Sequence, residues 1–223
     1  MAQFPFQIVG FDLDGTLVDS NHDLAPAINH ALSVVGRAPI PPEATRKLIG
    51  GGARLMLERA VELTGGVLPE AEFEAIYGEL QVHYAEHIAD NTVPYPGCLD
   101  ALDALAERGC KLAVLTNKIE VNTRLLLEAL GMIDRFEVIL GGDTLGPGRA
   151  KPAPDMIDTA MLLCGGGTFA MVGDSSYDVR AAKAANVPVV ALSFGYNDMP
   201  VQELGADAVI DRYDQLLGAL EGL

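Results

Sequence analysis

The feature that most constrains the fold is a regular alternation of apolar, strand-like runs with amphipathic helical segments from residue 94 onward. Short strands that alternate with helices are typical of βα units, whose strands pair in parallel. We therefore predict an α/β fold with a doubly wound, Rossmann-like parallel sheet. The spacing predicts strands at 111–116, 136–140, 169–173, 187–192 and 207–210, helices at 98–108, 119–130, 154–164 and 176–185, and a final helix at the C-terminus.

An earlier apolar run, Ile8–Phe11, predicts one more buried strand, and two carboxylates follow it. Asp12 and Asp14 stand two residues apart, with a turn residue, Gly15, directly after them. Open α/β sheets place their ligands at the C-terminal ends of their strands. Two negative charges this close repel each other unless a cation or a shared proton compensates them. The pair therefore predicts a binding site, and first of all a metal site.

The chain between the first strand and the remaining strands has a different, mostly helical pattern. Apolar residues at helical spacing predict helices over 24–35, 41–49, 55–65 and 69–89. We predict that residues 18–90 form an inserted small helical cap domain, and that residues 1–17 and 91–223 together form the α/β catalytic core domain. The hinges are expected near Val18–Ser20 and Asp90–Pro94.

Composition excludes several classes of protein. With 223 residues, 49% of them hydrophobic and 21% charged, the chain has an ordinary globular composition. A formal net charge of −16 argues against a nucleic-acid partner, because phosphates require a basic surface. No apolar stretch reaches the ~18 residues of a membrane helix, and no secretory signal is evident, so we expect no membrane partner. Three scattered cysteines favour free thiols and a cytoplasmic location, and the chain is expected to be a monomer or a homodimer.

Polar, charge-bearing residues follow four of the predicted strands. They are Asp12 and Asp14; Thr116, Asn117 and Lys118; Lys151; and the segment from Asp174 to Asp178. Each group alone is compatible with a turn, a helix cap or an exposed loop. In a parallel sheet, however, all such strand ends share one edge, so these residues can converge, and their joint occurrence at strand ends favours a functional site.

The chemistry of these residues favours phosphoryl transfer. The carboxylates of Asp12, Asp14 and Asp174 suit a hard cation such as Mg²⁺. The ammonium of Lys151 and the hydroxyl of Thr116, with nearby backbone N–H groups, suit phosphoryl oxygens. An aspartate can attack phosphorus to form an aspartyl-phosphate, and a second aspartate can protonate the leaving alcohol and then activate water.

On these residues the chain resembles the haloacid dehalogenase superfamily of phosphohydrolases, whose motifs occur in the same order. Stretches similar to the phosphoglycolate phosphatase group are 11–20, 49–54, 141–145, 171–175 and 191–197. The resemblance implies that Asp12 is the nucleophile and Asp14 the general acid and base. It implies a Mg²⁺ ion held by the Asp12 side chain, the Asp14 backbone carbonyl and Asp174, with Asp178 in support. Thr116, Asn117 and Lys151 would position the phosphoryl group.

The same resemblance implies a Mg²⁺-dependent phosphatase for a small phosphorylated metabolite, with 2-phosphoglycolate the leading substrate. In the cap, Gly51, Gly52 and Arg54 would read the carboxylate of that substrate. Two departures leave the substrate open: Ile119 stands where relatives usually carry proline, and the loop 146–149 is glycine-rich.

Several alternatives remain on the sequence alone. A pyrophosphatase or nucleotidase would differ only in cap chemistry, and a sugar-phosphate mutase would need a water-shielded intermediate. A non-catalytic phosphoacceptor or binding module is a different class, and so is a dehalogenase; neither requires Asp14. His83 and His87 stand four residues apart on a predicted helix, but no third ligand is evident, so we expect a solvated or interfacial helix face.

Overall fold

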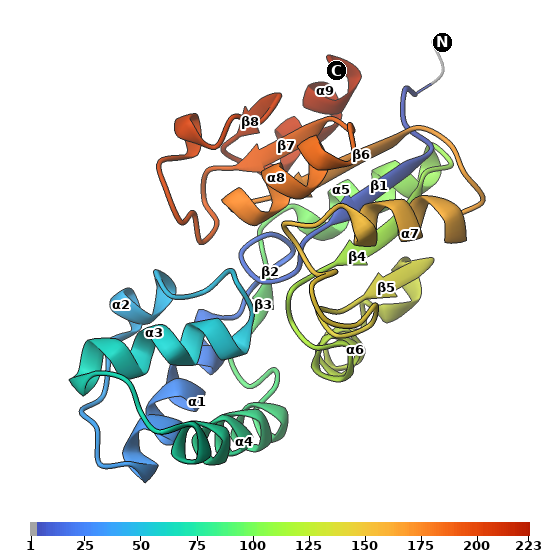
Figure 1. Cartoon of the computed structure of the whole chain (residues 1–223). Coiled ribbons are helices and arrows are strands. Elements are labelled where there is room, and N and C mark those ends of the chain that lie inside the picture. The colour runs from blue at the N-terminus through green and yellow to red at the C-terminus, as the bar shows by residue number, and fades with distance from the viewer. Residues whose placement is uncertain (1–3) are drawn as a thin grey trace.

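The computed structural model describes residues 4–223, and a six-stranded parallel sheet is its centre (Figure 1). The strand order is β5-β4-β1-β6-β7-β8, and every neighbouring pair is parallel. The strands are β1 (Ile8–Phe11), β4 (Lys111–Leu115), β5 (Val138–Leu140), β6 (Phe169–Gly173), β7 (Val189–Leu192) and β8 (Ala208–Ile210). This arrangement confirms the predicted α/β class with a doubly wound sheet.

Helices cover both faces of the sheet, which explains why its strands are continuous apolar runs. One apolar core joins one face to α5 (Cys98–Glu107), α6 (Glu120–Ala129) and α9 (Leu216–Glu221). A second core joins the other face to α7 (Asp155–Leu163) and α8 (Ser176–Ala184). Three short 3₁₀ helices, η1 (Ile133–Arg135), η2 (Val201–Glu203) and η3 (Tyr213–Gln215), lie in the connections.

A block of four helices lies apart from the sheet in Figure 1 and has an apolar core of its own. These helices are α1 (Asn21–Val34), α2 (Pro42–Arg46), α3 (Ala53–Gly65) and α4 (Glu70–Glu86). Helix α2 is shorter than the expected 41–49, because residues 47–50 form turns that lead to Gly50, whose φ of +134° is not helical.

The connection between this helical block and the sheet is a two-stranded antiparallel ribbon. Strand β2 (Val18–Asp19) pairs with β3 (Val93–Pro94), so both crossings run side by side. Both strands fall within the segments expected to be hinges. The division into a cap of residues 18–90 and a core of 1–17 and 91–223 stays a prediction. Within residues 4–223, no helix combines the length and apolar character needed to cross a membrane.

Candidate active site

The sheet order explains how distant segments of the chain reach one site. Strand β1 is paired with β4 on one side and β6 on the other. Asp12, Thr116 and Asp174 directly follow these three strands, so their parallel course brings the three residues to one edge. Lys151 reaches the same place from the loop between β5 and α7.

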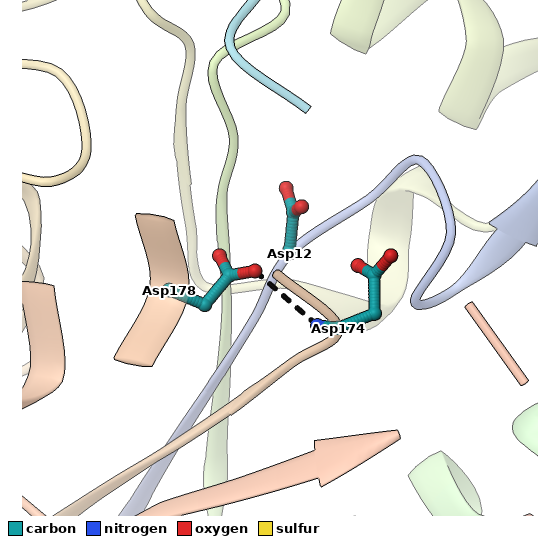
Figure 2. Close-up of side chains that lie close together, drawn as sticks. All are labelled: Asp12, Asp174 and Asp178. Atoms are coloured by element: carbon teal, nitrogen blue, oxygen red, sulfur yellow. Dashed lines mark hydrogen bonds between the residues drawn. The ribbon is translucent and has the colours of Figure 1, made fainter. Parts of the chain in front are cut away.

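Three buried carboxylates form the centre of the site (Figure 2). One oxygen from each of Asp12, Asp174 and Asp178 lies within 4.8 Å of the others. Burial raises the pKa of Asp12 to about 6; Lys151 opposes this change and Asp178 adds to it. Burial also raises the pKa of Asp174, and the negative charges of Asp178 and Asp12 raise it further. The negative charge of the three carboxylates is therefore not fully compensated by the neighbouring residues.

A single ammonium lies among these carboxylates. The Lys151 Nζ is 2.8 Å from Asp12 Oδ1 and 2.6 Å from Asp178 Oδ1, and its side chain is almost completely buried. Apart from this ion pair, Asp12 Oδ1 has no hydrogen-bond partner among residues 4–223, although it is buried. Carboxylate oxygens are the ligands that hard divalent cations prefer, and one lysine cannot neutralise three carboxylates. The residues present therefore fit a divalent cation such as Mg²⁺.

The orientation of Asp174 is fixed from both sides. Its Oδ1 accepts a hydrogen bond from the Thr16 hydroxyl (2.8 Å), and its Oδ2 accepts one from the Tyr196 backbone N–H (2.5 Å). Gly15 is required beside it, because Gly15 has a φ of +88° and a Cβ there would lie 2.4 Å from Asp174 Oδ2. The turn after β1 thus brings the chain against this carboxylate.

Asp178 also organises the start of α8. Its Oδ2 accepts hydrogen bonds from the backbone N–H groups of Asp174 (3.2 Å) and Ser175 (3.0 Å), the first of which is dashed in Figure 2. Ser175 and Asp178 form a capping box at the N-terminus of the helix. Asp178 therefore links the helix cap to Lys151.

The Asp14 side chain is not part of the group of three carboxylates and pairs with a different ammonium. Lys118 Nζ lies 2.7 Å from one Asp14 oxygen and 2.9 Å from the other, and the Ser20 hydroxyl donates a hydrogen bond to Asp14 (2.6 Å). Burial disfavours the charge of Lys118, but the Asp14 carboxylate and the Tyr84 hydroxyl together outweigh that effect, and the pKa of Lys118 is raised. Sequence reasoning gave Lys118 no role; its position directly after Thr116 and Asn117 was the available signal.

The residues expected to bind phosphate adjoin this centre. The Thr116 hydroxyl accepts a hydrogen bond from the Lys118 backbone N–H (3.2 Å). The Asn117 amide donates to the backbone carbonyls of Lys151 (3.0 Å) and Gly50 (3.4 Å), so it joins the Lys151 loop to the helical block. Phosphate binding by these residues stays a prediction.

A cavity of about 520 Å³, counting the part open to solvent, lies between the sheet edge and the helical block. The sheet side contributes Asp12, Asp14, Thr116, Asn117 and Lys118, and the helical block contributes Gly50, Gly52, Leu80, Gln81 and Tyr84, among others.

The cap residues proposed to read a carboxylate are not all at this cavity. Gly52 lines it, whereas Gly51 and Arg54 are absent from its lining within the described chain. The Arg54 guanidinium pairs with Glu74 and lies over the ring of Phe73, 5.1 Å from its centroid. The specificity role of Gly51, Gly52 and Arg54 therefore stays a prediction, and this geometry does not bring Arg54 to the site.

The fold and the site together define a class of α/β protein with an acidic sheet edge and a helical insertion. The family model for haloacid dehalogenase-like hydrolases matches residues 9–192, and the chain belongs to this family. It is therefore a hydrolase, and the resemblance inferred from its motifs is confirmed.

Similar proteins carry a more specific name. The phosphoglycolate phosphatase of Agrobacterium fabrum is 42% identical over 212 residues, which are 94% of this chain and 90% of that protein. The phosphoglycolate phosphatase of Rhodospirillum rubrum is 42% identical over 210 residues, covering 92% of this chain and 87% of its own. A crystal structure of a predicted phosphoglycolate phosphatase from Haemophilus somnus superimposes with a TM-score of 0.90 at 34% identity, covering 98% of both chains.

Proposed function

We propose that this protein is a Mg²⁺-dependent phosphatase that hydrolyses 2-phosphoglycolate to glycolate and inorganic phosphate. The observation that carries the proposal is the Asp12 carboxylate, buried against Lys151 at the base of a cavity that the helical block covers. Asp14 lies two residues away at the same cavity, where a proton donor is needed. The whole-length similarity to proteins named phosphoglycolate phosphatase supports the substrate.

In the first step, an Asp12 oxygen forms a bond to phosphorus while the bond from phosphorus to the glycolate oxygen breaks. Asp14 gives a proton to that departing oxygen. Lys151 lies 2.8 Å from Asp12 Oδ1, where its charge orients the nucleophile and attracts the phosphoryl group. Thr116 and Asn117 supply further polar contacts to the phosphoryl oxygens.

In the second step, Asp14 takes a proton from water while the water oxygen bonds to phosphorus. The bond from phosphorus to Asp12 breaks, which releases inorganic phosphate and restores the Asp12 carboxylate. Asp12, Asp174 and the Asp14 backbone carbonyl would hold Mg²⁺, with Asp178 in support. When bound, the ion offsets the negative charge of the substrate and of the carboxylates.

We further propose a cellular location and a class of partner for the enzyme. The three cysteines are free and buried, which supports a reducing, cytoplasmic location. The partner is a small phosphorylated metabolite, and the net charge of −16 supports the absence of a nucleic-acid partner.

A phosphate-release screen tests this function. The purified protein is assayed with 2-phosphoglycolate, sugar phosphates, nucleotides and pyrophosphate, with and without Mg²⁺, and Asp12→Asn serves as the inactive control. We expect the highest kcat/KM for 2-phosphoglycolate, and only with Mg²⁺. Equal, slow turnover of all compounds would reject the substrate but leave the phosphatase activity, whereas an isomerised sugar phosphate without phosphate release would indicate a mutase.

A further inference from the structure

The wall of the cavity formed by α4 carries two buried hydrogen-bond donors that have no acceptor within the described residues. One is the hydroxyl of Tyr84, a residue only 2% exposed. The other is the amide nitrogen, Nε2, of Gln81. Leaving such a group unpaired is unfavourable, so native proteins rarely keep one without a reason. Both donors line a cavity, and an acceptor on a bound ligand is such a reason.

The orientation of the Gln81 amide is set by a contact from the sheet side. Asn122 on α6 donates a hydrogen bond from its amide to Gln81 Oε1 at 2.8 Å. Because that oxygen is already occupied, Gln81 presents the donor end of its amide to the cavity. Asn122 is itself buried and also lines the cavity.

Lys118 adds a positive charge to the same wall. Its Nζ lies 4.5 Å from the centroid of the Tyr84 ring, and it is the one basic side chain among the described residues that line the cavity. The ammonium has three donors, and its contacts with the two Asp14 oxygens leave one of them. Burial raises the pKa of Tyr84 to about 12, so its hydroxyl remains a donor at neutral pH.

A hydroxyl, an amide N–H and an ammonium complement a ligand group that is negatively charged and only accepts hydrogen bonds. A carboxylate has both properties. Asp12 and Asp14 line the same cavity, so this carboxylate belongs to the molecule whose phosphoryl group meets Asp12.

We propose that Gln81, Tyr84 and Lys118 form the subsite that binds the carboxylate of the substrate. This inference rests on the proposed function and deepens it, because it places carboxylate recognition on α4 and the strand β4 edge. The Arg54 side chain, held by Glu74 on the outside of the cavity, is not part of this subsite.

The test compares two substrates that differ in one group. 2-Phosphoglycolate carries a carboxylate, and 2-hydroxyethyl phosphate carries a hydroxymethyl group in its place. Tyr84→Phe removes only the hydroxyl, and Gln81→Glu replaces an amide donor with a negative charge. We expect Tyr84→Phe to lower kcat/KM for 2-phosphoglycolate about 10-fold, mainly through KM, and to change the value for 2-hydroxyethyl phosphate less than about 2-fold. Gln81→Glu should lower the first value further.

Tyr77→Phe is the matched control, because Tyr77 is on the same helix but does not line the cavity. It should leave both values unchanged. Thermal unfolding of every variant is recorded, and Tyr84→Phe should not lower the melting temperature, since the hydroxyl it removes donates no hydrogen bond within residues 4–223.

The possible outcomes separate the two proposals. If the wild-type enzyme does not prefer 2-phosphoglycolate to 2-hydroxyethyl phosphate, the proposed function is wrong and the subsite with it. If the wild type shows the preference and both α4 variants keep it, only the subsite is wrong. Equal losses on both substrates would also overturn it, because they would indicate a general effect on the catalytic groups.

Discussion

Replacing Asp12 with asparagine should abolish turnover and make the metal-free protein more stable. Asp12 is 6% exposed and lies among other carboxylates. Its pKa is raised from 3.8 to about 6, chiefly by burial, with Lys151 acting in the opposite direction. This difference corresponds to about 3 kcal/mol of free energy against the charged form. At neutral pH the Asp12 carboxylate is ionised although burial disfavours its charge. Its ionisation therefore lowers the stability of the folded protein.

The pH dependence follows from the sign of this change. A carboxyl whose pKa is higher in the folded state binds its proton more tightly there than in the unfolded chain. The destabilisation is therefore absent below the ordinary pKa of 3.8, grows as the pH rises toward about 6, and is complete above it. Asparagine has the same shape without the charge, so the gain in unfolding free energy should approach about 3 kcal/mol near pH 7.5 and shrink near pH 4.5.

Urea denaturation followed by circular dichroism, in EDTA at both pH values, measures this difference. Asp134→Asn is the control, because Asp134 is exposed and should change neither value. The reasoning fails if Asp12→Asn is no more stable than the wild type near pH 7.5, or if its advantage is independent of pH; attraction to Lys151 would then outweigh burial. Near-normal turnover by the variant would refute the covalent mechanism.

Three further predictions address the metal, the hinge and the helical block. Asp174→Asn should raise the Mg²⁺ concentration needed for half-maximal phosphatase activity at least about 10-fold in a Mg²⁺ titration, and an unchanged requirement would contradict its role as a ligand. Tyr196→Phe should lower the urea-derived unfolding free energy by about 1–3 kcal/mol, because the buried hydroxyl donates to a carboxylate of β2 (2.6 Å) and accepts the first backbone N–H of α1 (2.9 Å). His83→Phe should reduce the loss of melting temperature between about pH 7.5 and 5.5. Burial and the charges of His30 and His87 lower the pKa of His83. The stability that the neutral His83 side chain contributes is therefore present above the ordinary pKa of 6.5 and is lost as the pH falls through the lower pKa of the folded state. An unchanged loss of melting temperature in His83→Phe would contradict this.

The convergence of Asp12, Thr116 and Asp174 could be predicted because it depends on two local patterns. Each residue follows an apolar run, and the alternation with helices requires the runs to pair in parallel. Parallel strands share one C-terminal edge whatever their order. The edge could therefore be predicted before the order β4-β1-β6 was known.

The contacts across the cavity could not be predicted in this way. Helical spacing is enough to place Tyr84 on the apolar face of its helix, where it is buried. Periodicity cannot show that its hydroxyl lacks a partner, because that depends on how α4 packs against the sheet edge. Arg54 shows the same limit: a basic residue soon after three glycines suggests an anion site, and the sequence pattern does not show that its guanidinium pairs with Glu74, twenty residues later.

The charges of the site also determine the order in which ligands bind. Asp12, Asp14, Asp174 and Asp178 face only the ammonium groups of Lys118 and Lys151 within the ion pairs of the site, so it is two charges negative when all are ionised. Phosphate would be repelled by this site, and by a chain of net charge −16. A divalent cation brings the charge of the site to zero and so removes this repulsion. Calorimetric titration with inorganic phosphate should therefore detect binding only with Mg²⁺ present, and equal affinity in EDTA would show that the two lysines alone reverse the local potential.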